Sequence, residues 1–209
     1  MAKVLEPKCK RCRREGEKLF LKGDRCYTAK CAIVKRNFPP GLHGAKGRAK
    51  LTGYGTQLRA KQKAKRYYGV LEKQFRRYYD IAARKRGETA ENLLQILESR
   101  ADNFVCRAGW AKSRAQARQL VSYGHIRVNG KRITIPAYSL KKGDVVEVDL
   151  SSQKNAYFES VKPTLEKYEV PVWISMDPKE MKARYLEYPT IEQAAALFDL
   201  TSIVEFYSR

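Results

Sequence analysis

The chain has 209 residues and a strong excess of positive charge, with 43 Lys and Arg against 22 Asp and Glu and a formal net charge of +21. This length suffices for two modest domains, and the charge calls for a polyanionic partner rather than a small-molecule substrate. No apolar run approaches the roughly 18 residues of a membrane helix. Residues 1–14 also lack the apolar segment of a secretory signal, so we expect an intracellular protein that binds no membrane.

The positive charge is unevenly distributed along the chain. Residues 1–69 hold 20 Lys and Arg but only 4 Asp and Glu, whereas residues 151–209 hold 7 Lys and Arg and 9 Asp and Glu. One third of the chain therefore carries most of the excess, which is typical of a phosphate-binding surface. The slightly acidic C-terminal quarter is expected to face a different partner.

Residues 1–50 read as loop-like and contain four cysteines in two short-range pairs. Cys9 and Cys12 are followed, after a 13-residue loop, by Cys26 and Cys31. Two such pairs can present four thiolates to a tetrahedral ion, and zinc would supply folding free energy to a segment that has few large apolar residues. We expect one structural zinc ion. Reduced unpaired thiols, disulfides in an oxidising compartment and an iron–sulfur cluster are the alternatives.

Other residues with metal-binding or catalytic side chains are sparse. His43 is left out of the metal shell because four thiols complete it, and Cys106 lies in an apolar helical pattern where a buried thiol is expected. The chain has 2 His and none of the phosphate-loop, dinucleotide or zinc-protease motifs. Nothing in the sequence therefore indicates an enzyme.

The next segment predicts helices. A helix over Thr56–Tyr68 carries cations around most of its circumference, and a second over Leu71–Arg86 ends at Gly87. The second helix has an aromatic stripe that we assign to the core rather than to base stacking. A third helical region follows Thr89, with apolar residues at intervals of three and four until Gly109.

The stretch from Ser113 to Gly124 predicts a capped basic helix. Ser113 can cap its first turn, Gln116 can reach back to form a capping box, and Gly124 can stop it in a left-handed conformation. Arg114 and Arg118 are four residues apart and share one face, while apolar residues share another. One face can therefore pack while the other binds RNA.

A hairpin is predicted after this helix. Asn129-Gly130 suits a type I′ turn, and apolar residues alternate around it at Ile126, Val128, Ile133 and Ile135. A further strand is expected through Val146, Val148 and Leu150. The rest of the chain suggests a weakly amphipathic helix over 153–168, strands over Trp173–Met176 and Ala183–Tyr188, and final helical turns over Thr201–Tyr207.

Several of these motifs resemble the family of bacterial-type small-subunit ribosomal protein four. The segment from Glu98 to Lys131 resembles the RNA-binding domain named after that family, which also occurs in some tRNA synthetases and pseudouridine synthases. The flanking motifs are specific to the ribosomal proteins: Arg13-Arg14-Glu15-Gly16, Pro40-Gly41-Leu42-His43-Gly44, the basic run Gln57–Lys63, the segment Tyr68–Phe75 and the terminal Glu205–Arg209. Leu42 and Ala101 depart mildly from the family pattern, and the cysteine quartet belongs to a subset of its members.

This resemblance implies a structural, non-enzymatic protein of the cytoplasmic small ribosomal subunit. Members bind 16S-type ribosomal RNA at a multi-helix junction early in assembly, and some repress their own messenger. The resemblance also implies a contact with small-subunit ribosomal protein five, at an interface that affects decoding accuracy. Lys46, Arg48 and Lys50 match the basic stretch that faces mRNA where it enters the ribosome. The acidic C-terminal quarter becomes the expected protein-facing side.

We expect an α+β fold in three parts. A zinc-bound, loop-rich segment (1–50) precedes a helical domain (51–97), on which residues 190–209 pack, and an inserted RNA-binding domain (98–189) has two helices and a small twisted antiparallel sheet. Contacts to phosphates and 2′-hydroxyls are expected from cations on preformed elements. These are Arg11, Arg13, Arg14, Arg59, Lys61, Lys63, Arg66, Arg114, Arg118, Lys131 and Arg132, beside the three residues that match the mRNA-facing stretch.

Two other classes of protein could carry parts of this pattern. An RNA-modifying or aminoacylating enzyme with the same RNA-binding domain would need a carboxylate or nucleotide-binding motif, which the remaining residues lack. A zinc-finger DNA-binding protein would need a recognition helix close behind its ligands, whereas here the cysteines lie in predicted loops.

Overall fold

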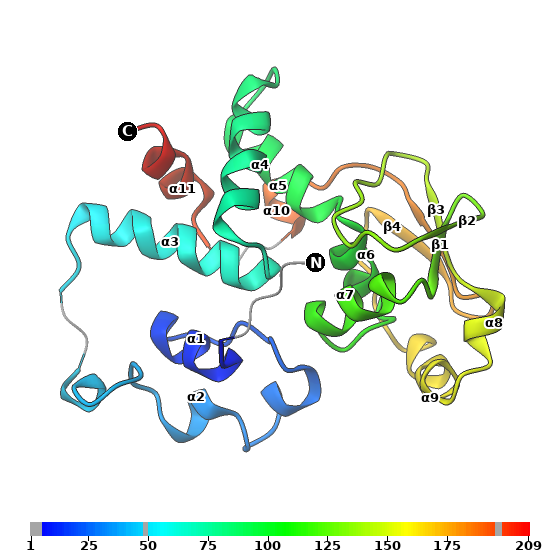
Figure 1. Cartoon of the computed structure of the whole chain (residues 1–209), viewed down its shortest axis with the longest axis horizontal. Helices are drawn as coiled ribbons and strands as arrows, with labels where there is room; N and C mark the ends of the chain where they lie inside the picture. Colours follow the sequence, from blue (N-terminus) through cyan, green and yellow to red (C-terminus); the bar gives the residue numbers. More distant parts are fainter. Residues whose placement is uncertain (1–5, 48–49, 195–197) are drawn as a thin grey trace. The chain divides into compact units, whose positions relative to one another are not determined.

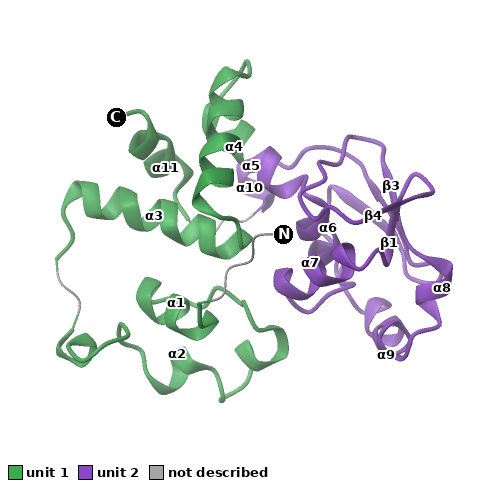
Figure 2. Cartoon of the chain, viewed as in Figure 1, with its two compact units in different colours: residues 1–93, 196–209 green, residues 94–195 purple. Residues whose placement is uncertain are grey.

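The computed structural model describes residues 6–47, 50–194 and 198–209. The chain divides into two compact units, and Figure 2 colours them separately. Unit 1 comprises residues 1–93 and 196–209, and unit 2 comprises residues 94–195. The second unit is thus a continuous segment inserted into the sequence of the first.

The N-terminal part of unit 1 consists of short helical elements. They are α1 (Lys8–Glu15), the 3-10 turn η1 (Gly23–Cys26), α2 (Ala32–Lys35) and the 3-10 turn η2 (Gly44–Lys46). The loop-like prediction was wrong for α1, which forms two turns and ends at Gly16 with a φ of 82°. Its inner side is buried together with Leu19, and it packs against α2 and α3 (Gly53–Tyr68). Tertiary contacts therefore stabilise a helix that the local sequence does not predict.

The helical part of unit 1 is built on α3, α4 (Glu72–Arg84) and α11 (Leu200–Tyr207). The Thr52 hydroxyl accepts the Gly55 N–H, so α3 begins three residues before the predicted start. The α4 stripe is buried at Phe75, Tyr78 and Ala82, which confirms its assignment to the core. Figure 1 shows α11 beside α3, and the contacts between these two helices are extensive.

The predicted third helical region is in fact two helices. α5 (Thr89–Glu98), which crosses the unit boundary, is separated from α6 (Ala101–Arg107) by an extended residue, Arg100, with φ −66° and ψ 137°. The segment 136–140 causes this break. The Ala101 N–H donates to the Tyr138 carbonyl at 2.8 Å, and the Leu140 N–H donates to the Ser99 carbonyl at 2.8 Å. α7 (Arg114–Ser122) follows and packs against α6.

Unit 2 also contains a five-stranded antiparallel sheet in the order β2-β1-β3-β5-β4. The strands are β1 (Ile126–Val128), β2 (Lys131–Ile133), β3 (Val145–Val148), β4 (Ile174–Asp177) and β5 (Lys182–Tyr185). The turn between β1 and β2 has φ values of 48° at Asn129 and 76° at Gly130, as a type I′ turn requires. This confirms the predicted hairpin and, with the helices, the α+β class.

The alternation of buried apolar residues along the strands ends earlier than the sequence predicts. Ile135 lies outside β2 and is 60% exposed, and Leu150 lies in α8 (Leu150–Gln153) and is 75% exposed. The amphipathic segment becomes α9 (Ala156–Leu165), and α10 (Ile191–Ala194) ends the unit. Among the described residues, no helix is long and apolar enough to cross a membrane.

Candidate nucleic-acid interface

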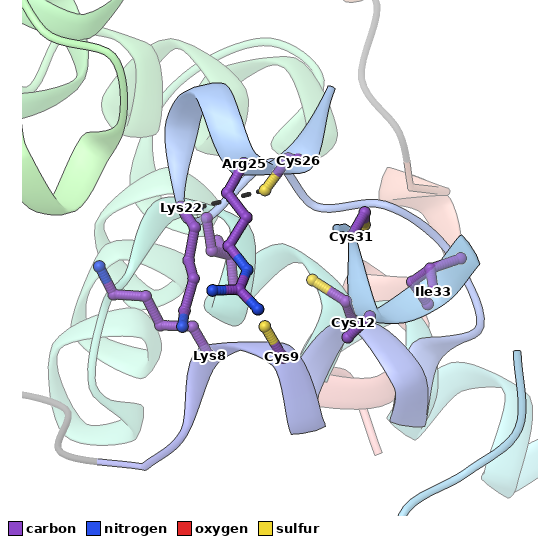
Figure 3. A pocket seen from close by; sticks show the side chains of 10 residues that line it. Lys8, Cys9, Cys12, Lys22, Arg25, Cys26, Cys31 and Ile33 are labelled. Atoms are coloured by element: carbon purple, nitrogen blue, oxygen red, sulfur yellow. Dashed lines mark hydrogen bonds between the residues drawn. The ribbon is translucent and has the colours of Figure 1, made fainter. Parts of the chain in front are cut away.

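The four N-terminal cysteines line one pocket of unit 1 (Figure 3). Cys9 and Cys12 lie on α1, Cys26 ends η1, and Cys31 immediately precedes α2. Three short elements, none of which has a sizeable core of its own, thus place their thiols around a common space. The pocket is also lined by Lys8, Leu21, Lys22, Arg25, Ala32 and Ile33.

The surroundings of these thiols fit a soft divalent ion. Burial raises the pKa of Cys12, a backbone hydrogen bond at Leu19 lowers it, and negative charge on the other three cysteines would raise it. The Lys22 N–H donates to the Cys26 sulfur at 3.4 Å. Four neighbouring thiolates repel one another, and a bound Zn²⁺ would remove that repulsion. Within residues 6–47, 50–194 and 198–209, no three potential ligands are already arranged to hold a metal ion, so zinc remains a prediction.

The arginines of α1 differ in their surroundings. Arg11 is buried and pairs with Glu6 at 3.3 Å. The Arg13 guanidinium lies 4.8 Å from the ring centroid of Phe38 and donates to the carbonyls of Phe38 and Pro39 at 3.0 and 3.2 Å. Arg14 is exposed. Two of these three predicted RNA contacts therefore hold the N-terminal segment together, and Arg14 faces solvent.

Cations on α3 are paired with carboxylates of the N-terminal segment. The buried Glu15 carboxylate accepts hydrogen bonds from Arg66 and, at 3.4 Å, from Arg59. Burial raises the pKa of Glu15, and the charges of Arg66 and Arg59 oppose the rise. Lys63 pairs with Glu17 at 2.5 Å. These contacts join the end of α1 to α3 and leave parts of each cation accessible.

Lys61 is buried and its ammonium makes contacts inside the protein. Its Nζ lies 2.8 Å from a Glu72 carboxylate oxygen and 4.6 Å from the centroid of the Phe206 ring. The Tyr207 hydroxyl donates to the same carboxylate at 2.7 Å. Lys61 therefore helps to hold α11 on the helical part of unit 1, although the sequence placed it among the RNA contacts.

The predicted mRNA-facing cations lie at the end of the N-terminal segment. Lys46, the last residue of η2, and Lys50 are exposed. Arg48 lies outside the described residues.

On unit 2, the predicted cations of α7 are anchored by α6. The Arg114 Nε donates to the Asn103 side chain at 2.7 Å, and an Arg118 guanidinium nitrogen lies 3.6 Å from an Asp102 carboxylate oxygen. The Ser113 hydroxyl accepts the Gln116 N–H at 3.4 Å, which confirms the predicted cap. The Gln116 side chain, however, accepts the N–H of Lys112, one residue before the cap, so the reciprocal half of the box is shifted.

The β1–β2 hairpin carries the remaining predicted cations and one that sequence reasoning missed. Lys131 is exposed, and Arg132 pairs with Asp149 at 2.9 Å. Arg127 pairs with the same carboxylate at 2.6 Å and lies directly opposite Arg132 in the hairpin register. The alternation of β1 around the Asn129-Gly130 turn already places Arg127 on the face opposite to its buried neighbours.

Comparison with known proteins shows the family of the chain. Residues 3–98 match the family described as the ribosomal protein S4/S9 N-terminal domain, and residues 99–146 match the S4 domain. The chain is 51% identical to small ribosomal subunit protein uS4A of Alkaliphilus metalliredigens, with 100% of both chains covered. It is 52% identical to the uS4 proteins of Thermotoga petrophila and Dictyoglomus turgidum, again over 100% of each chain.

The chain belongs to the ribosomal protein S4 family. It is therefore a structural ribosomal protein of the small subunit, which implies binding to ribosomal RNA, and it is not an enzyme. The location inferred from the resemblance, the small ribosomal subunit in the cytoplasm, follows from the same membership. The residues that contact RNA and the bound metal remain predictions.

Proposed function

We propose that this S4-family protein is a primary binder of small-subunit ribosomal RNA, which joins a multi-helix junction early in assembly through phosphate contacts on both of its units. The observation that carries this proposal is the exposed charge of the described N-terminal residues up to Lys50, where nine exposed cations stand against three exposed acids, Glu6, Glu17 and Asp24. The exposed cations there are Lys10, Arg14, Lys22, Arg25, Lys30, Lys35, Arg36, Lys46 and Lys50. Of the exposed acids, Glu6 and Glu17 are already paired with cations of the chain.

Charge density and fixed geometry both favour RNA as the ligand. Cations that are held on helices by Asn103, Asp102 and Glu15 lose less conformational freedom on binding than free surface side chains. Such preformed cations contact phosphates and 2′-hydroxyls where RNA helices converge, with little reading of base edges.

Salt-dependent binding tests the proposal. The affinity for a small-subunit ribosomal RNA fragment should fall linearly on a log–log plot against salt, with a slope of about −0.7 to −0.9 per phosphate neutralised. Arg14→Gln, Lys46→Gln and Lys50→Gln should each weaken binding and make the slope shallower by one such increment. Lys167→Gln, at an exposed position of the acidic quarter, is the matched control. A salt-independent affinity, or equal affinity for duplex DNA at the same salt, would refute the proposal.

We further propose zinc as the ion of the cysteine pocket. The support is the set of four thiols around one pocket and the N–H that donates to the Cys26 sulfur. The purified protein should contain one zinc per chain, and a strong chelator should accelerate amide exchange in residues 6–45 while leaving residues 98–150 protected. Stoichiometric iron with visible absorbance would instead identify an iron–sulfur cluster. A metal-free protein with unchanged exchange would contradict both.

Three narrower proposals concern the partners on the ribosome. Lys46, Arg48 and Lys50 would contact mRNA where it enters the small subunit, and the acidic C-terminal quarter would face ribosomal protein five at an interface that affects decoding accuracy. Repression of its own messenger would use the same RNA-binding surface. Site-specific crosslinking in assembled subunits tests these contacts. Crosslinkers are placed at position 46 and at exposed positions in residues 159–192, and the crosslinked partners distinguish contacts to mRNA or protein from contacts to ribosomal RNA alone.

A further inference from the structure

The β1–β2 hairpin brings two arginines together in a way that the fold alone does not favour. Arg127 and Arg132 are register partners, so their side chains leave the hairpin on the same face. The opposite face is buried at Ile126, Val128 and Ile133. Like charges directly opposite each other destabilise an antiparallel pair. This arginine pair therefore needs a compensating negative charge.

Asp149 supplies that charge with one carboxylate oxygen for each guanidinium. The Arg127 Nε lies 2.6 Å from Oδ1, and an Arg132 Nη lies 2.9 Å from Oδ2. The Ser151 hydroxyl donates to Oδ2 at 2.7 Å, and the Asp149 backbone N–H donates to the His125 carbonyl at 2.9 Å. Asp149 is thus fixed through its main chain and its side chain, and it fixes both arginines in turn.

Further contacts hold the two arginine side chains. The Arg132 aliphatic chain lies against Gly124, where an added Cβ would be 3.1 Å from the Arg132 Cδ. One Arg127 Nη donates to the Gly130 carbonyl at 3.4 Å. Each side chain therefore has two restraints. An arginine ordered before binding loses less rotamer entropy when it contacts a ligand.

The guanidiniums remain open to solvent although their anchor is buried. The side chains of Arg127 and Arg132 are 40% and 55% exposed, whereas that of Asp149 is 2% exposed. Hydrogen bonds from the Ser151 hydroxyl and both guanidiniums lower the pKa of Asp149 to about 2, so it stays charged at neutral pH. The other N–H groups of the pair have no partner among the described residues, and two arginines against one carboxylate leave a net positive charge.

We propose that Arg127 and Arg132 form a clamp for one backbone phosphate of RNA and that Asp149 is its positioning residue. The inference rests on the proposed RNA-binding function and assigns that function a further site. Planar guanidinium forks match phosphate oxygens, and here two guanidiniums are held by the two oxygens of one carboxylate. Glu147 of β3 is the register partner of Arg127 on its other side, so the phosphate approaches from the β2 side, next to Arg132.

The Asp149→Asn variant distinguishes two roles of Asp149, because RNA affinity should change in opposite directions if Asp149 positions the arginines and if only net charge matters. The substitution removes a negative charge, so charge attraction alone would tighten RNA binding. Loss of positioning would instead weaken binding to the ribosomal RNA fragment by about five- to tenfold. Glu147→Gln is the matched control, because it makes the same charge change beside Arg127, whereas the ion pairs of both guanidiniums are with Asp149, and it should leave affinity equal or higher.

Two further measurements separate the clamp from a purely structural ion pair. The double variant Arg127→Gln/Arg132→Gln should make the salt slope shallower by about 0.7 to 0.9, the value for one phosphate, and in that background Asp149→Asn should have no effect on binding. Arg127→Lys/Arg132→Lys keeps the charge and removes the forks. It should weaken binding about fivefold without loss of thermal stability.

The outcomes also distinguish this inference from the function on which it rests. Failure of the wild-type protein to bind the RNA fragment would contradict the proposed function itself. Wild-type binding combined with unchanged or tighter binding of Asp149→Asn would overturn the clamp and leave the proposed function intact. Unchanged binding of the double-lysine variant would overturn the clamp as well, even where Asp149→Asn does not fold.

Discussion

At the scale of single residues, several carboxylates of this basic protein each pair with two cations. With 43 Lys and Arg and 22 Asp and Glu, a one-to-one arrangement would leave many cations without an acidic partner. Four carboxylates show the arrangement: Glu15 with Arg59 and Arg66, Glu72 with Lys61 and Lys65, Asp102 with Arg100 and Arg118, and Asp149 with Arg127 and Arg132. Each such group lowers repulsion within the fold and keeps a net positive charge for RNA.

Glu72 should make protein stability depend on pH in the acidic range. Burial acts to raise its pKa, but hydrogen bonds from Lys61, Lys65 and Tyr207 outweigh burial and lower the pKa to about 2 from a usual 4.5. A carboxyl whose pKa is depressed by folding stabilises the protein above its unfolded pKa, and this contribution disappears as the pH falls through the folded pKa. The stabilisation should therefore be complete near neutrality and decline between about pH 4.5 and pH 2.

The variant Glu72→Gln tests this expectation. Because Glu72 is partly exposed, the variant should lose about 0.5 to 1 kcal/mol of unfolding free energy at pH 7 in urea titrations. The difference from wild type should shrink as the pH is lowered through the window. Glu88→Gln, at an exposed position outside these hydrogen bonds, should show no such convergence. A pH-independent difference would contradict the assignment to Glu72 ionisation.

These residue-scale pairings explain why the sequence predicts a cationic RNA-binding protein but not which of its cations are paired within the fold. Lys61 and Arg127 are both cations in basic segments, yet Lys61 is buried under α11, whereas the Arg127 side chain beside Asp149 is 40% exposed. The partners of a cation depend on segments distant in sequence, such as Glu15 and Arg59, which are 44 residues apart. Charge composition indicates that RNA is bound, whereas tertiary contacts decide which cations remain available.

At the scale of elements, local sequence signals were sufficient to predict where a helix begins or a hairpin turns wherever the sequence carries a cap or a turn motif. α7 begins at the predicted Ser113 cap, and the hairpin turns at Asn129-Gly130. By contrast, α1 and the break between α5 and α6 depend on contacts with distant segments and were missed. Hydrophobic periodicity alone extended the helix through Arg100, because it contains no information about the hydrogen bonds that residues 136–140 make there.

The Ser113 cap should contribute measurably to the stability of unit 2. Ser113 is buried and its hydroxyl accepts the Gln116 N–H at 3.4 Å, so Ser113→Ala removes the side-chain cap of α7 and leaves this N–H with the Ser113 carbonyl alone, at 3.0 Å. The expected loss is about 1 kcal/mol of unfolding free energy by denaturant titration. Ser122→Ala is the control, because the Ser122 hydroxyl bonds only to a carbonyl within the helix, and its effect should be near zero. Equal effects of both variants would argue against a specific cap.

At the scale of the whole molecule, unit 1 is assembled from both ends of the chain. Its C-terminal helix α11 buries Leu200 and Ile203, and Gln57 of α3 donates to Glu205 at 2.7 Å. The Tyr207 ring also stacks on Tyr79 of α4 with centroids 4.8 Å apart. Unit 2, a continuous segment with its own sheet, needs neither end of the chain to complete its strands. The two units should therefore respond differently to removal of the C-terminus.

Deletion of residues 199–209 should destabilise unit 1 selectively. The truncation removes the apolar cover of α3 and α4 and leaves Lys61 without the Phe206 ring, so we expect a loss of at least about 3 kcal/mol from unit 1. Amide exchange should accelerate in residues 53–84 and stay unchanged in residues 126–148. Tyr207→Phe, which removes only the hydroxyl bond to Glu72, should produce a much smaller acceleration in the same helices. Equal acceleration in the strands of unit 2 would show that the two units unfold together, and the inserted segment would then depend on the part of the chain that encloses it.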